Sequence, residues 1–451
     1  MSFKSCKCLI KKGVEEGCIK YDHPVIIVIL GHLAIFLLAI PYYCKFNLYS
    51  LFNIFLMVLL YILFFSMPFI VGCFLKFYNN NSKKYLLNLY HKVFYNPYLY
   101  ALLMFIFIFY GVYVVNKSIF LSFIYPLIVI FILSIYGKYS NNGFININNN
   151  FKDNNNNFKN NKNNINNTND FNNFNNNFKN KLNYILTQIS KYINDIIFII
   201  GIISFILIVV LYGGIPLFNY DIRMRISSDP LRLISTGALV YAGLNNFKYF
   251  LASFLIMILL GYKAGVLILC ASYIIYLYRT KKISTKYLFI SFIGLLGILA
   301  IMAKVILMFS NQNWKVNVLG ILSYRAYFDM TVLDKIINYG SHTWGGIVFN
   351  PVGEKFIGKL LFEYTHNMTA TLFGPIYLDF GYYGLIFATL LGIGSKIIYE
   401  NENNKKIYSI YAAILLTMCE IGINYGFLIV FLVLLYVVSL NKYFLKNIDD
   451  K

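Results

Sequence analysis

The stretch PVIIVILGHLAIFLLAIPYY at residues 24–43 carries no charged side chain. A helix needs about 20 largely apolar residues to cross a bilayer, so this stretch is long enough to span a membrane. It has no small-residue cleavage site of the kind that ends a signal peptide, so we expect it to be retained. The sequence therefore predicts a transmembrane helix close to its amino terminus.

Similar apolar stretches recur along the chain and predict an all-α fold, a polytopic transmembrane helix bundle of about 12 spans. The composition agrees, because 59% of the residues are hydrophobic and only 13% are charged. A soluble domain carries nearly twice that charge. The predicted spans are residues 24–43, 50–75, 98–116, 118–136, 195–213, 231–247, 249–262, 264–279, 287–308, 376–396, 407–424 and 426–441.

The net charge of +21 lies mostly in short loops between these spans, as topology signals do, which argues against a nucleic-acid partner. With the amino terminus in the cytoplasm, each short basic cluster falls on the cytoplasmic side, including Arg279–Lys286 and Lys396–Lys406. The positive-inside rule then predicts that both termini are cytoplasmic, in a multi-pass protein of the cytoplasmic (plasma) membrane.

Four regions are expected. Residues 1–140 form an amino-terminal membrane segment with about 4 spans. Residues 141–193 form an Asn-rich cytoplasmic linker, which should be disordered because it cannot bury enough apolar surface. Residues 194–441 form the catalytic membrane core with two outer loops, 213–230 and 309–375, and residues 442–451 form a cytoplasmic tail.

The two outer loops retain arginines on the side of the membrane that normally lacks them, notably Arg223, Arg225 and Arg325. A guanidinium group matches phosphate oxygens bidentately, so an anion-binding surface is one interpretation. The other is that these are solvated loop charges paired with Asp221 and Asp229. Apolar residues at helical spacing in Arg325–Tyr339 and Glu354–Tyr364 also predict in-plane helices within the larger loop, which would roof a cavity.

Several kinds of chemistry have no motif in the sequence. It contains no Walker A loop, no H-E-x-x-H and no G-x-S-x-G. Its histidines do not have metal-ligand spacing, and the short loop after the first predicted span, about Cys44–Tyr49, has no acid. We therefore expect no metal and no cofactor. No predicted span carries charge at mid-depth, which argues against an ion-coupled transporter.

Three stretches resemble the oligosaccharide repeat unit polymerases, the O-antigen (Wzy-type) polymerases of bacteria and their archaeal relatives. They are GGIPLFNYDIRMR at 213–225, LLGYKAGVLIL at 259–269, and His366-Asn367 followed by TATLFGPIYLDFGYYG. The likeness covers about residues 195–440. One departure is Lys263, where relatives tend to have Arg, because Lys cannot make a bidentate phosphate contact.

The resemblance implies a metal-independent membrane glycosyltransferase that moves a growing glycan from a polyprenyl pyrophosphate onto the next lipid-linked repeat. Its partners would be the polyprenyl-pyrophosphate-linked oligosaccharide, membrane lipid, a chain-length regulator and a flippase. The pyrophosphate would be bound by Arg223, Arg225, Lys263 and Arg325. His366 would act as the base for the acceptor hydroxyl, with Glu363 and Asp379 in reserve.

Alternatives to these assignments stay open. Lys263 in a membrane protein can simply extend its amine to the interface, and a loop histidine such as His366 is by default a solvated surface residue. The nearest rival function is an O-antigen ligase-type glycan transferase. A lipid-linked oligosaccharide flippase or other transporter is a second rival, although the two similar halves and the charged lumen that it would need are not evident.

Overall fold

The computed structural model describes residues 20–77, 94, 96–115, 192, 194–309, 317–364, 367–400 and 405–449. Three predictions fall outside these residues: the span at 118–136, the Asn-rich tract at 141–180, and His366. Every other predicted span corresponds to a helix, and the described residues contain no strand. The all-α prediction is confirmed.

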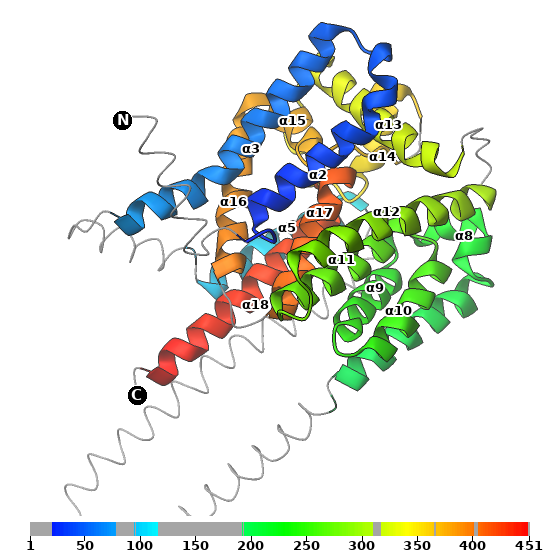
Figure 1. Ribbon diagram of the computed structural model, residues 1–451, viewed down its shortest axis with the longest axis vertical. Coiled ribbons are helices and arrows are strands. Elements are labelled where there is room, and N and C mark those ends of the chain that lie inside the picture. The colour runs from blue at the N-terminus through cyan, green and yellow to red at the C-terminus, as the bar shows by residue number, and fades with distance from the viewer. Residues whose placement is uncertain are drawn as a thin grey trace, which may run out of the picture.

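The helices follow the chain in a simple order, interrupted by short 3₁₀ turns (Figure 1). They are α2 (Pro24–Ala39), η1 (Ile40–Lys45), α3 (Leu48–Phe77), α5 (Pro97–Val115), a helix at Asn194–Tyr212, η3 (Pro216–Phe218), α8 (Tyr220–Arg225), η4 (Ile226–Ser228), α9 (Pro230–Gly243), α10 (Phe247–Leu260), α11 (Lys263–Arg279), α12 (Thr285–Met308), α13 (Val318–Asn338), α14 (Gly353–Phe362), α15 (Gly374–Phe380), η5 (Gly381–Tyr383), α16 (Gly384–Glu400), α17 (Lys405–Ile421) and α18 (Tyr425–Asp449).

Five helical stretches of the described chain are long and apolar enough to cross a membrane. They are Pro24–Lys45, Leu48–Gly72, Asn194–Tyr212, Thr285–Met308 and Gly374–Glu400, and shorter apolar helices occur at Pro97–Ile108, Phe247–Leu260 and Tyr425–Leu440. The protein is therefore a multi-pass membrane protein. The number of 12 spans and the cytoplasmic position of both termini stay predictions.

Two hydrophobic cores divide the bundle. The larger core joins α2, α3 and α5 to α13 and α15–α18, so the amino-terminal helices pack directly on the carboxy-terminal ones. The smaller core joins the Asn194–Tyr212 helix to α8–α12. Helix α17 packs against both α11 and α2, and its residues enter both cores. Figure 1 shows α17 between the two groups.

A third, smaller cluster lies where α13 and α14 meet the segment before α15. The helical periodicity predicted for this region is confirmed, because Ala326, Met330 and Leu333 of α13 are buried while the lysines of α14 are exposed. Helix α13 begins earlier than the pattern indicated and packs on α2, α3 and α12. This segment is therefore integrated with the bundle. Helix α18 likewise continues through most of the tail that was expected at 442–451.

Glycine at position 392 permits the close approach of α16 to α3. A Cβ atom added to Gly392 would lie 2.1 Å from the carbonyl oxygen of Phe65. That oxygen belongs to the backbone, so rotation of a side chain cannot relieve the clash. We expect Gly392→Ala to reduce the free energy of unfolding by about 1–3 kcal/mol through overpacking. Thermal unfolding of the purified full chain in detergent measures this.

Gly297→Ala in α12 is the matched control, because a Cβ there meets no atom within 4 Å. Alanine is the better helix former by about 1 kcal/mol, so this variant should be at least as stable as the wild type. Equal unfolding temperatures for Gly392→Ala and the wild type would show that α3 and α16 do not pack this closely.

Candidate functional site

The loop at residues 213–230 folds into short helices with side-chain caps. Asn219 accepts a hydrogen bond from the Ile222 N–H at 3.1 Å and so starts α8. Asp229 accepts from the Leu231 N–H at 2.7 Å and starts α9. Residues two apart on a helix point in different directions. Arg223 is accordingly buried, with 7% of its surface exposed, whereas Arg225 is exposed.

The turn between α10 and α11 packs against Arg223. Gly261 ends α10 with a φ of 76°, and a Cβ atom there would lie 3.2 Å from Cδ of Arg223, so a glycine is needed for two reasons. The next residue, Tyr262, donates its hydroxyl proton to the Arg223 carbonyl oxygen. Two stretches that carried the family resemblance, 213–225 and 259–269, therefore form one contact.

Arg232 joins the same group from the first turn of α9. Its guanidinium lies 4.4 Å from the centre of the Tyr262 ring, and it donates to the carbonyl oxygens of Ile226 at 3.1 Å and Ser227 at 2.6 Å. Backbone carbonyls neutralise none of its charge. Arg232 thus contributes a fixed positive charge beside Arg223.

Arg325 lies at the centre of a second group. Its guanidinium donates to the Thr369 hydroxyl, which donates to Asp329 at 2.9 Å. It also forms ion pairs with Asp329 at 3.6 Å, one helical turn away, and with Glu420 of α17 at 3.9 Å. Arg325 Nε and Asp329 Oδ2 are nevertheless buried without a hydrogen-bond partner among the described residues.

Glu354 and Lys263 connect the two groups. Glu354 accepts from Asn424 at 2.6 Å, and the charges of both Arg325 and Arg232 act on its carboxylate. Lys263 interacts electrostatically with Glu420, Arg325 and Asp329. We call the whole set the polar cluster; it comprises Arg223, Arg232, Tyr262, Lys263, Arg325, Asp329, Glu354, Glu420 and Asn424. Six helices and two short turns therefore bring cations and carboxylates to one end of the bundle.

Burial acts on both signs of charge in the polar cluster. Burial raises the pKa of Asp329 to about 7, although Arg325 opposes the shift. Burial also raises the pKa of Glu354, against the hydrogen bond from Asn424, and lowers the pKa of Lys263. Asp329 is therefore partly protonated near neutral pH, which weakens its neutralisation of Arg325. Such perturbed groups gather at functional sites more often than elsewhere.

The structure brings three of the predicted site residues together and places others apart. Arg223, Lys263 and Arg325 belong to the polar cluster. None of the described contacts of the cluster involves Arg225, which is exposed, or Glu363, which is exposed at the left-handed residue that ends α14 with a φ of 59°. His366 lies outside the described residues.

Asp379 is fully buried and has a different environment. It accepts hydrogen bonds from the Thr343 hydroxyl, from the Ile347 N–H at 3.0 Å and from the Val348 N–H at 2.7 Å. These donors belong to the loop before α14 and occupy both carboxylate oxygens. The geometry indicates that Asp379 orders this loop.

Six members of the polar cluster were not among the predicted site residues: Arg232, Tyr262, Asp329, Glu354, Glu420 and Asn424. Asp329 follows Arg325 at the i,i+4 spacing of a helical ion pair, and that spacing was a signal available in the sequence. Arg232 lies in the first turn of α9, on the predicted outer side of the membrane, where the positive-inside rule gives no reason for a cation. Glu420 is an ionisable residue near the end of an apolar helix, which is itself a signal in the sequence. Nothing local marks Glu354, because its partner Asn424 lies far away in the chain.

Among the described residues, no three His, Cys, Asp or Glu side chains gather as ligands for a metal ion.

Comparison with known proteins places the chain in a family. The model of the family described as "Putative O-antigen polymerase" matches residues 92–436, which confirms the resemblance and extends it towards the amino terminus. An uncharacterized protein of Methanocaldococcus jannaschii is 45% identical over 416 residues, which cover 92% of each chain. No solved structure matches.

Proposed function

Because the chain belongs to the putative O-antigen polymerase family, we propose that it joins lipid-linked oligosaccharide repeats into a surface polysaccharide. The reaction takes place at the outer face of the cytoplasmic membrane. The growing chain leaves its polyprenyl pyrophosphate and is transferred to the terminal sugar of the next lipid-linked repeat. Family membership supports the role in polysaccharide synthesis. The lipid-linked mechanism is what the resemblance implies, and the cations of the polar cluster are compatible with it.

The observation that carries this proposal is the gathering of Arg223, Arg232, Lys263 and Arg325 at one end of the bundle. Negative charge develops on the pyrophosphate as its bond to the sugar breaks. Fixed positive charges held in a partly buried site stabilise that charge without reorganising first. The guanidinium of Arg325 is a planar fork of the kind that pairs with two phosphate oxygens, and its Nε, which faces Glu420 at 3.9 Å, makes no hydrogen bond among the described residues.

Glycosyl transfer at this site forms one bond and breaks one. The acceptor hydroxyl oxygen attacks the anomeric carbon of the donor sugar and forms the new glycosidic bond. The bond from that carbon to the pyrophosphate oxygen breaks, and the pyrophosphate leaves with the electron pair. The hydroxyl proton passes to a base. Metal independence is part of the proposal, with the cations taking the role that a metal ion has in other transferases.

His366 is our proposed base. Only three peptide units separate it from Thr369, a chain length of about 11 Å at most. Thr369 itself contacts both Arg325 and Asp329 of the polar cluster. Glu363 stays in reserve, and we assign Asp379 to positioning the loop before α14.

Deletion of the gene tests the function. We expect the deletion strain to carry single repeats in place of long surface glycan, because repeats are still made and exported but not joined. Gel electrophoresis of surface glycan would show short species in place of a ladder. Profiling of lipid-linked glycans would show single repeats on the lipid. A normal ladder in the deletion strain excludes the polymerase function.

The same strain separates the rival functions. A ligase defect would leave long glycan on the lipid carrier. A flippase defect would leave single repeats that a membrane-impermeant oxidant cannot reach in intact cells, whereas a polymerase defect leaves them within its reach. The proposed partners, a flippase and a chain-length regulator, act on either side of this step.

A further inference from the structure

A basic hollow opens at the opposite end of the bundle from the polar cluster. Its volume is about 570 Å³. Lys263 begins α11 and Arg279 ends it, and 17 residues of helix extend over about 25 Å, so the two sites are separated by the length of that helix. The hollow is lined by Lys20, Tyr278, Arg279, Lys281, Lys282, Ile283, Ser284, Thr285 and Lys405. Among these described lining residues, none is acidic.

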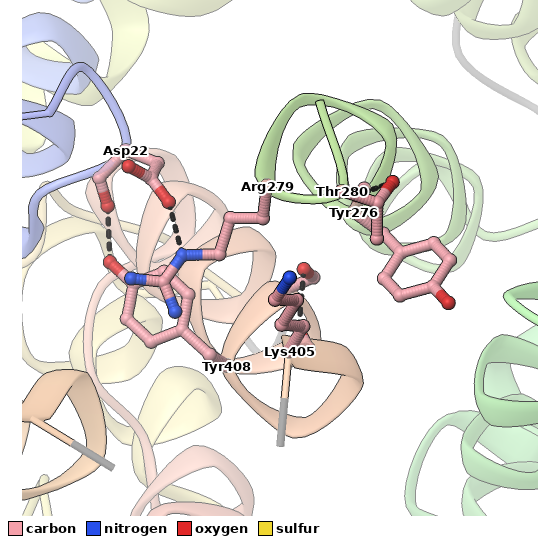
Figure 2. A network of polar contacts seen from close by, with 7 residues as sticks. Asp22, Tyr276, Arg279, Thr280, Lys405 and Tyr408 are labelled. Atoms are coloured by element: carbon pink, nitrogen blue, oxygen red, sulfur yellow. Dashed lines mark hydrogen bonds and ion pairs between the residues drawn. The ribbon is translucent and has the colours of Figure 1, made fainter. Parts of the chain in front are cut away.

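Arg279 is held rigidly at the edge of the hollow. Figure 2 shows its guanidinium reaching from the end of α11 towards Asp22 and lying over the Tyr408 ring. Its Nε donates to Asp22 at 2.5 Å, the ring centre of Tyr408 is 3.7 Å away, and the Tyr408 hydroxyl donates to the Asp22 carbonyl oxygen. Only 6% of the Arg279 side chain is exposed.

One nitrogen of Arg279 is left without a partner by this arrangement. Nη2 is buried and has no hydrogen bond among the described residues. A buried donor without a partner is costly, and such atoms in a folded protein call for an explanation. Arg279 is one of the residues that line the hollow, so an anion bound there is a group that could accept from this nitrogen after a small movement of the side chain.

The first turn of α12 adds further donors to the same wall. Ser284 is the residue before the helix, and its side chain makes no capping hydrogen bond. The N–H groups of a first helical turn have no partner within the helix, and the helix dipole favours negative charge there. Ser284 and Thr285 both line the hollow, so these donors face the same space as the lysines.

We propose that this hollow binds the phosphate group of an anionic membrane lipid headgroup. Helix α12 is long and apolar enough to cross the membrane, so its first turn stands at the level of the headgroups. A phosphate there accepts from Arg279 and from the first turn of α12, and Lys281 and Lys282 neutralise it. The site is independent of the polar cluster and of glycan transfer.

Binding of defined lipids to the purified full chain in detergent tests the site. Phosphatidylglycerol is titrated beside phosphatidylcholine and inorganic phosphate, with calorimetry as the readout. Lys282→Gln is compared with Lys286→Gln, which removes the same charge from a neighbouring exposed lysine that does not line the hollow. We expect Lys282→Gln to weaken phosphatidylglycerol binding about fivefold, since a lysine near an anionic surface contributes about 1 kcal/mol. Lys286→Gln should bind as the wild type does.

Each outcome has one meaning. Saturable binding of phosphatidylglycerol that weakens only in Lys282→Gln supports a lipid headgroup site. The same variant pattern with inorganic phosphate supports the phosphate site and identifies the free ion as a ligand. Equal weakening by both variants shows general surface charge and overturns the proposal, as does the absence of binding. Because no glycan is used, failure here leaves the polymerase proposal untouched.

Discussion

Replacing Arg325 by alanine should reduce polymer formation about 100-fold or more, the loss seen when one donor to a developing negative charge is removed. The guanidinium is the group that unites Thr369, Asp329 and Glu420, so alanine also removes the positive charge at the centre of the polar cluster. Complementation of the deletion strain, followed by gel analysis of surface glycan, measures the effect.

Two further variants make this result specific. Arg325→Lys keeps the charge but lacks the fork, and it should retain an intermediate activity. Lys359→Ala removes a positive charge from an exposed position on α14 and should leave the ladder intact. Thermal unfolding of each purified variant shows whether the protein is folded. A folded Arg325→Ala protein that restores the full ladder would contradict the role of the polar cluster in transfer.

Stability should fall as pH rises from about 4 to about 7, because burial raises the pKa of Asp329 to about 7 from the ordinary aspartate value of 3.8. Within that window the folded chain holds a proton that the unfolded chain has released, so the folded state gains stability at the acidic end and loses it towards neutral pH. Between pH 5 and pH 8 the change from this one group is on the order of 3 kcal/mol.

The variant Asp329→Asn should flatten this dependence, since an amide does not titrate. Arg325, Glu420 and Lys263 act on the same carboxyl and remain in the variant. Asp221→Asn is the matched control, because Asp221 is an exposed carboxyl on α8 that keeps its solvation on folding. Unfolding temperatures of the wild type and both variants, measured across this pH range, test the prediction. A profile that is equally steep in Asp329→Asn would place the titrating group elsewhere.

Most of the fold could be predicted from the sequence because it depends on local patterns. An apolar run such as residues 24–43 identifies its own helix, and the buried stripe Ala326, Met330 and Leu333 follows from helical periodicity. Helix α13 begins earlier than the sequence pattern predicts, because its first turn, where Val318 is exposed, shows no periodic apolar pattern of its own.

The candidate site could be predicted only in part because its contacts are long-range. Arginines on an unexpected side of the membrane pointed to Arg223 and Arg325. Glu354 and Asn424 are separated by 70 residues in sequence, and no local pattern pairs them. By residue type, Asp379 is as suitable a reserve base as Glu363, but its hydrogen bonds to the loop before α14 give it a positioning role. The type of a residue indicates which chemistry it can perform, whereas the residues that pack against it in the fold determine which role it takes.

Helix α17 has a consequence for how the protein is made. It joins the two hydrophobic cores and carries Glu420 in its last turn, yet it emerges from the ribosome after nearly all other described helices. Domains generally begin to fold in the order of their synthesis. The two helical groups can first meet through α12 and α13, and α17 then inserts its contacts with α11 and α2 between them. A nascent chain stopped before residue 405 lacks Glu420 and Asn424, so it cannot complete the polar cluster, however well its earlier helices are inserted.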